Sequence, residues 1–145
     1  MATAPYLAEE LEGPFTEAEL SYALKALLLG KSTGPDGHPV SFYRALFPLL
    51  KDHLLQLYNS FTHEMGLTPT MAAADIALMP KPGGTHTLCS AYRSIALLNI
   101  ESKLYNKMLV TRHESHLPGL IDLDQVGFIK QHQGLDKIRR LAHLV

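Results

Sequence analysis

The stretch from Asp75 to Asn99, "DIALMPKPGGTHTLCSAYRSIALLN", contains two short apolar segments on either side of a polar loop. The first segment is "DIALMP" (residues 75–80) and the second is "SIALL" (residues 94–98). Both have the length and residue types of strands, and a loop of about a dozen residues with a Gly–Gly pair separates them. The pattern predicts that the two segments pair as an antiparallel hairpin.

Two basic residues flank the loop of this predicted hairpin. Lys81 follows the first strand and Arg93 precedes the core of the second, and in an antiparallel pair these positions lie at the same end. Arginine can bind a phosphate through two parallel hydrogen bonds, whereas lysine acts as a point charge. The hairpin end is therefore either a phosphate grip or an ordinary charged turn in solvent, and spacing alone leaves both interpretations open.

The segment "FTEAELSYALKALLLG" (residues 15–30) predicts a helix before the hairpin. Thr16 and Glu19 have the spacing of a capping box, and Gly30 is a suitable stop signal. Its apolar positions recur at helical spacing: Leu20, Ala23, Leu24, Leu27 and Leu28.

Further helices are expected on both sides of the hairpin. Residues 40–66 form a helical region that Pro48 splits, and Asn99 can cap a helix over residues 100–117. A last amphipathic helix is predicted at residues 135–145. The expected fold class is therefore α+β, with helices packed on a small antiparallel sheet; residues 1–14 are expected to be a flexible lead-in.

Composition excludes several classes of protein. The 145 residues are 46% hydrophobic and 19% charged, which is typical of a globular domain. No window of about 18 residues is apolar and uncharged, so no membrane span is predicted, and the N-terminus lacks a signal-peptide pattern. The lone Cys89 fits a reducing compartment. We therefore expect an intracellular protein, cytoplasmic or nuclear and not secreted.

Charge is distributed unevenly along the chain. Residues 1–75 carry four Lys/Arg against nine acidic residues, a formal charge of −5. Residues 76–145 carry nine Lys/Arg against five acidic residues, a formal charge of +4. A basic half is a weak indication of contact with a polyanion, and ordinary variation of surface charge is the alternative.

Three other kinds of site lack their characteristic sequence patterns. The stretch "GKST" (residues 30–33) lacks the first glycine of a phosphate-binding loop and is followed by "GPDG" in place of a helix. His113 and His116 lack a zinc-protease spacing, and no serine lies in a nucleophile-elbow pattern. We therefore expect no metal site and no catalytic residue.

Five blocks of sequence, taken in order, resemble the N-terminal part of the reverse transcriptase domain of LINE-type (non-LTR) retrotransposons. The resemblance runs from about Phe15 to the C-terminus. The blocks are "PFTEAEL", "GKSTGPDGHPVSFYRALFPLL", "IALMPKPGG…YRSIALLN", "SKLYNKMLVTR" and "DQVGFIKQHQGLDKIRRLAHL". Each block alone is weak, but five in the right order and spacing are specific.

This resemblance implies that residues 15–145 form the fingers region of an RNA-directed DNA polymerase. It implies that Lys81 and Arg93 contact the phosphates of the incoming nucleotide. It also implies a structural turn at "GPDG" (residues 34–37). A last group of residues would contact the template path and the nucleic-acid backbone: Gly127, Phe128, Lys130, Lys137, Arg139 and Arg140.

The same resemblance implies that the chain does not polymerise DNA alone. Polymerases hold two divalent ions with palm carboxylates, and neither the palm aspartate block nor a "YADD"-type motif occurs in these 145 residues. Mg²⁺ would need those carboxylates, so we expect no bound cofactor. The expected protein is a truncated reverse transcriptase that binds RNA/DNA template-primer or dNTP phosphates weakly and without sequence preference.

Several positions depart from the family pattern. Ser94 replaces a usual Pro, Ala96 a usual Ser, and Gln131–His132 a usual Gly–Arg pair, the last change removing a cation expected near nucleic acid. The alternative is a protein-interaction or inert remnant module whose apolar helix faces dock a partner, such as the remainder of a reverse transcriptase.

Overall fold

The computed structural model describes residues 11–64, 66–83, 87–114 and 116–117. The chain divides into two compact units, one formed by Glu12–Met108 and the other by residues 1–11 together with 109–145. The elements are α2 (Glu17–Ala26), α3 (Val40–Ala45), α4 (Phe47–Glu64), α5 (Pro69–Ala72), β1 (Ala74–Pro80), the 3₁₀ turn η1 (Cys89–Ala91), β2 (Tyr92–Leu98) and α6 (Ile100–Glu114). The predicted α+β class is confirmed.

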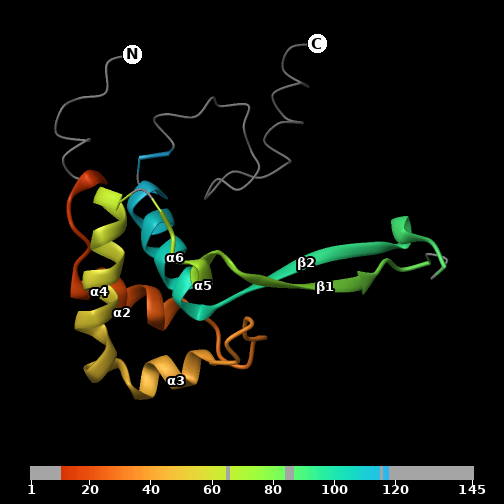
Figure 1. Ribbon diagram of the computed structural model, residues 1–145, viewed down its shortest axis with the longest axis horizontal. Coiled ribbons are helices and arrows are strands. Elements are labelled where there is room, and N and C mark those ends of the chain that lie inside the picture. The colour runs from red at the N-terminus through yellow and green to blue at the C-terminus, as the bar shows by residue number, and fades with distance from the viewer. Residues whose placement is uncertain (1–10, 65, 84–86, 115, 118–145) are drawn as a thin grey trace, which may run out of the picture. The chain divides into compact units, whose positions relative to one another are not determined.

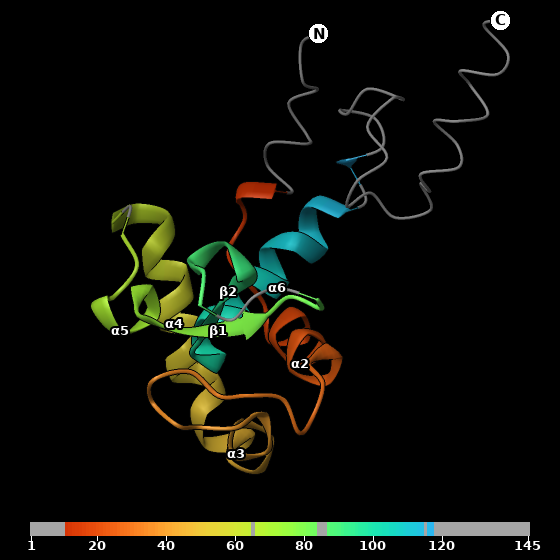
Figure 2. The same ribbon diagram turned by 90° about the vertical axis from the view of Figure 1, so that its right-hand side faces the viewer.

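The predicted hairpin is present. Strands β1 and β2 pair antiparallel, with a register that runs from Ala74 opposite Leu98 to Pro80 opposite Tyr92. These two strands make up the sheet of the described residues. The hairpin extends away from the helices of its unit in Figure 1 and is seen nearly end-on in Figure 2.

Helix α2 begins where the sequence predicted. The Thr16 side chain accepts from the Glu19 N–H at 3.4 Å, and the Glu19 carboxylate accepts from the Thr16 N–H at 2.8 Å. This capping box satisfies backbone donors that have no partner within the helix. The Glu17 carboxylate also pairs with the Lys51 ammonium of α4, 2.8 Å away.

The predicted end of this helix at Gly30 was wrong. The helix stops at Ala26 because Leu27 adopts an extended backbone, with φ −72° and ψ 133°. Leu28 consequently lies beyond the helix and is exposed, instead of on its buried face. Gly30 belongs to the following turn, where its φ of 69° is the left-handed conformation that glycine adopts at little cost.

Pro48 marks the predicted break between two helices. Helix α3 ends at Ala45, and the 18-residue α4 begins at Phe47, which places Pro48 in its first turn. A proline is tolerated there because its missing N–H has no partner within the helix.

The core of the Glu12–Met108 unit lies between the helices. Four rings form its aromatic centre, with Phe15, Tyr58 and Phe61 around Tyr105 at centroid distances of 5.7, 5.4 and 5.4 Å. The buried apolar residues of the helices also include Leu20, Ala23, Leu24, Val40, Tyr43, Leu54, Met71, Ile100, Leu104 and Met108. Most of the hairpin thus lies outside this core, which leaves its side chains accessible.

Among the described helices, none is both long and apolar enough to cross a membrane.

Candidate nucleic-acid interface

Lys81 is anchored at the end of the hairpin by its main chain and its side chain. Its backbone N–H donates to the Ala91 carbonyl at 2.7 Å, which extends the ladder one pair beyond Pro80 and Tyr92. Its Nζ donates to the Ser90 carbonyl at 2.9 Å. An ammonium has three donors, so this bond orients the group while leaving donors for a ligand.

Arg93 lies on the same face of the hairpin as Lys81. Arg93 is opposite Met79 in the register, and Lys81 follows Met79 by two residues. Because side chains alternate between the faces of a strand, Met79, Lys81 and Arg93 share one face. Lys81 and Arg93 are therefore diagonal cross-strand neighbours, a separation that long side chains can span.

The charge of the hairpin is concentrated at this end. In the described part of residues 74–98, Lys81 and Arg93 are accompanied by one acidic residue, Asp75, opposite Leu97 near the other end of the ladder. Both cationic side chains are exposed. This separation of charge gives the loop end a positive potential, which attracts anions.

Apolar side chains lie beside the two cations. Met79 is 52% exposed and Ile95 is 42% exposed on the same face, while Ile76 and Leu78 lie on the opposite face at 62% and 65%. An exposed surface with cations next to apolar groups can contact both the phosphates and the sugars or bases of a nucleic acid.

Gly83 leaves the backbone of the loop open to a ligand. Its φ is +73°, and a Cβ added there would meet nothing within 4 Å. The described side of the loop, up to residue 83, therefore leaves room for close approach by a ligand.

The remaining residues predicted for the site lie outside the described residues. These are the six proposed template-path and backbone positions: Gly127, Phe128, Lys130, Lys137, Arg139 and Arg140. The altered Gln131–His132 pair lies there as well.

Sequence reasoning missed what Asn99 does at the base of the hairpin. Its carbonyl accepts from the Lys103 N–H at 3.1 Å, as expected at a helix start. Its side chain, however, joins two other segments: Oδ1 accepts from the Asp36 N–H at 3.2 Å and Nδ2 donates to the Thr70 carbonyl at 3.0 Å. The turn signals of "GPDG" identified one partner segment, but no local pattern connects it to Asn99.

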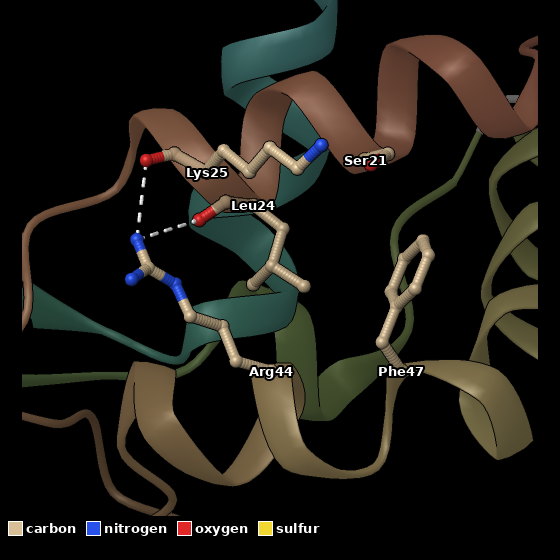
Figure 3. Close-up of a pocket in the computed structure, with 5 residues that line it drawn as sticks. All are labelled: Ser21, Leu24, Lys25, Arg44 and Phe47. Carbon is tan, nitrogen blue, oxygen red and sulfur yellow. Dashed lines mark hydrogen bonds between the residues drawn. The ribbon is translucent and has the colours of Figure 1, made fainter.

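A shallow hollow of about 370 Å³ lies away from the hairpin, where α2 faces α3 and the start of α4 (Figure 3). Its wall includes Ser21, Leu24, Lys25, Arg44 and Phe47. Arg44 Nη2 donates to the carbonyls of Leu24, Lys25 and Leu27 at 3.4, 3.1 and 2.9 Å. This guanidinium therefore serves the C-terminal end of α2, where a cation is favoured.

Within the described ranges, no group of three or more His, Cys, Asp or Glu side chains could hold a metal ion.

No protein-family model matches the chain. The chain is 30% identical over 117 residues to a protein of Xenopus laevis named "Transposon TX1 uncharacterized 149 kDa protein", a match that covers 81% of this chain and 9% of that protein. It is 27% identical over 131 residues to "Probable RNA-directed DNA polymerase from transposon BS" of Drosophila melanogaster, covering 89% of this chain and 14% of that protein. The chain thus spans about a tenth of the length of these relatives. The resemblance to LINE-type reverse transcriptases is confirmed to this extent: the chain is similar to two transposon-encoded proteins, one of which is named as a probable RNA-directed DNA polymerase.

Proposed function

We propose that the β1–β2 hairpin contacts the phosphates of a nucleotide or of a template–primer, as part of the fingers of a reverse transcriptase. The observation that carries this proposal is the placement of Lys81 and Arg93 on one exposed face at the loop end of the ladder. The similarity to a probable RNA-directed DNA polymerase supports the choice of ligand class.

The two side chains differ in what they can contribute. The Arg93 guanidinium can bind two oxygens of one phosphate in a planar fork, which fixes an orientation. The Lys81 ammonium, oriented by its bond to the Ser90 carbonyl, adds a point charge. Contacts of this kind carry no sequence preference and weaken as salt rises, because counterion release becomes less favourable.

The 145 residues are proposed to bind without polymerising. Transfer of a nucleotidyl group needs carboxylates that hold two Mg²⁺ ions, and by the resemblance those carboxylates belong to palm motifs that do not occur in this sequence. The chain is proposed to act inside the cell, where its lone Cys89 would stay reduced. The basic residues between Lys130 and Arg140 are proposed to extend the contact along the nucleic-acid backbone.

A second candidate function is docking of another protein, such as the remainder of a reverse transcriptase, on the apolar side chains of the hairpin. The observation that favours it is the exposure of Ile76 and Leu78 on the face opposite the cations. Static light scattering tests the form of this candidate in which a second copy of the chain docks: a monomer over a range of concentrations argues against self-association through this face.

Fluorescence anisotropy with a labelled primer–template duplex tests the main proposal. The wild-type chain is expected to bind at about 50 mM salt and to lose affinity steeply by about 200 mM. Each of Lys81→Ala and Arg93→Ala should weaken binding and reduce the slope of log Kd against log salt by about one.

Lys31→Ala is the matched control, because Lys31 is also an exposed loop lysine but lies outside the hairpin. It removes the same charge and should leave the slope near that of the wild type. Equal losses for Lys31→Ala and Lys81→Ala would show general charge attraction and would count against a hairpin site, as would a complete lack of binding at low salt.

A further inference from the structure

The base of the hairpin is compact and centres on one side chain. Strand β1 begins at Ala74, one residue after the C-cap of α5, and β2 ends at Leu98, immediately before Asn99. Asn99 is only 4% exposed although it is polar. A buried amide is stable only when its donors and acceptor are paired, so its partners define a specific local arrangement.

The Asn99 amide joins both flanks of the hairpin base. Through Nδ2 it reaches the Thr70 carbonyl of α5, just before β1, and through Oδ1 it reaches the Asp36 N–H of the loop between α2 and α3. Because Asn99 follows β2 directly, these bonds tie the exit of β2 to the entry of β1 and to the helical body.

The turn over residues 34–37 packs closely against Asn99. Gly37 N–H donates to the Gly34 carbonyl at 3.0 Å, and the Asp36 carboxylate accepts from the His38 N–H at 2.9 Å. A Cβ at Gly34 would overlap Asn99 Oδ1 and the Leu98–Asn99 peptide. Only glycine allows this contact, so the turn over residues 34–37 is a seat for the hairpin base.

Neighbouring contacts hold the same elements from the α6 side. Ser102 Oγ donates to the Met71 carbonyl at 2.7 Å, and Lys103 Nζ donates to the Ser32 carbonyl at 3.1 Å. These bonds fix α6 against α5 and the loop, but their side chains are further along the chain from β2. Asn99 is the member of this group that adjoins a strand.

We propose that Asn99 is a positioning residue, which sets the direction in which the β1–β2 hairpin leaves the helical body by locking its base onto the Gly34–Gly37 seat and α5. The consequence of this positioning for phosphate binding rests on the proposed function. If loss of the lock leaves the competent direction populated about a fifth of the time, the Kd for a primer–template rises about fivefold.

Pulsed electron–electron distance measurement tests the orientation directly and without nucleic acid. The native Cys89 is exposed beside the loop end of the hairpin, and Leu49→Cys supplies a second label on an exposed position of α4. The distance distribution is expected to be narrow in the wild-type background and to broaden in Asn99→Ala. An unchanged width in Asn99→Ala would overturn the proposal.

Asn59→Ala is the matched control, because Asn59 also makes two long-range backbone hydrogen bonds, both to Phe15. It should destabilise the body without broadening the hairpin distribution; equal broadening would reduce Asn99 to a general stability residue and overturn the proposal. If Asn99→Ala does not fold, Asn99→Asp replaces it, since the carboxylate keeps the Asp36 bond and loses the donor to Thr70. Asn99→Asp should broaden the distance distribution less than Asn99→Ala, and an unchanged width would again contradict the positioning role.

Anisotropy on the same variants separates this inference from the proposed function. A fivefold higher Kd in Asn99→Ala, with the Kd of Asn59→Ala near that of the wild type, supports both the positioning role and the proposed function. A broadened hairpin in a protein whose wild type binds no primer–template would leave the positioning role in place and refute the proposed function alone.

Discussion

Phe15 and Asn59 exchange two hydrogen bonds across 44 residues of sequence: the Phe15 N–H donates to Asn59 Oδ1 at 2.6 Å, and Asn59 Nδ2 donates to the Phe15 carbonyl at 3.2 Å. This pair holds the segment before α2 against α4. It also keeps the Phe15 ring on Tyr105, at a centroid distance of 5.7 Å. The start of the helical body is therefore fixed by one amide.

Asn59→Ala is expected to lower the free energy of unfolding by about 2 kcal/mol, since each lost hydrogen bond contributes about 1 kcal/mol. Urea denaturation followed by circular dichroism measures the change. Asn59→Asp keeps the acceptor and loses the donor, so it should show about half the loss. A midpoint equal to that of the wild type in Asn59→Ala would show that the pair contributes no net stability.

Gly34→Ala should destabilise the chain by about 1–3 kcal/mol, because the added methyl group overlaps the hairpin base. Gly37→Ala is the comparison: its Cβ would meet nothing within 4 Å, and its φ of +72° costs only about 1 kcal/mol for a left-handed alanine. Thermal and urea unfolding of both variants give the ranking. A larger loss for Gly37→Ala would contradict the close packing of Gly34 on Asn99.

Arg44 offers a test of the α2 C-terminus. Arg44→Ala removes a guanidinium that bonds three carbonyls there and should cost about 1–2 kcal/mol, as a cation at a helix C-terminus does in a favourable geometry. All three bonds come from one nitrogen, so Arg44→Lys should recover part of the loss. Urea midpoints of the two variants decide this, and equal destabilisation by Lys and Ala would refute a role for the charge.

The buried hydroxyl of Tyr58 is expected to lower the free energy of unfolding in alkali. Burial, and then the charge of Glu101, raise the pKa of its hydroxyl above the ordinary value, and the pKa of Tyr43 is raised by the same two causes. Unfolded tyrosines ionise near pH 10, where the folded groups remain protonated. The unfolded state then binds fewer protons, so the free energy of unfolding falls as pH rises above about 10, by up to about 1.4 kcal/mol per pH unit for each tyrosine.

Tyr58→Phe isolates this contribution. It loses the 3.0 Å bond from the hydroxyl to the Glu101 carbonyl, which should cost about 1 kcal/mol at neutral pH, but its stability should fall less steeply above pH 10. Urea unfolding at intervals from pH 7 to pH 11 supplies both slopes. Parallel curves for the two proteins would show that Tyr58 does not titrate with unfolding.

The hairpin and the helix starts were predictable because their signals are local. Short apolar segments of strand length predicted β1 and β2, and the spacing of Thr16 and Glu19 predicted the capping box. The same kind of signal was overlooked in α5, where Thr68 caps the helix and Pro69 occupies its first position. That helix is one turn long, so apolar periodicity could not reveal it.

Features that depend on distant residues were not predictable. At the early end of α2, the Arg44 guanidinium donates to the Leu27 carbonyl. The role of Asn99 depends on its hydrogen bond from the Asp36 N–H, 63 residues away. For the site, spacing gave the shared end of Lys81 and Arg93, but their shared face depended on a register that only the paired strands establish. The identity of a phosphate ligand came from resemblance and stays a proposal.

The most direct measurement of the central claim is a two-dimensional NMR titration of the labelled chain with a short primer–template duplex at low salt. Phosphate binding by the hairpin predicts that amide signals of Lys81, Arg93 and their neighbours in β1 and β2 shift progressively, together with the Arg93 side-chain Nε–H, while signals of α2 and α4 stay in place. Unchanged hairpin signals at saturating duplex, or shifts centred on α2 and α4, would contradict it.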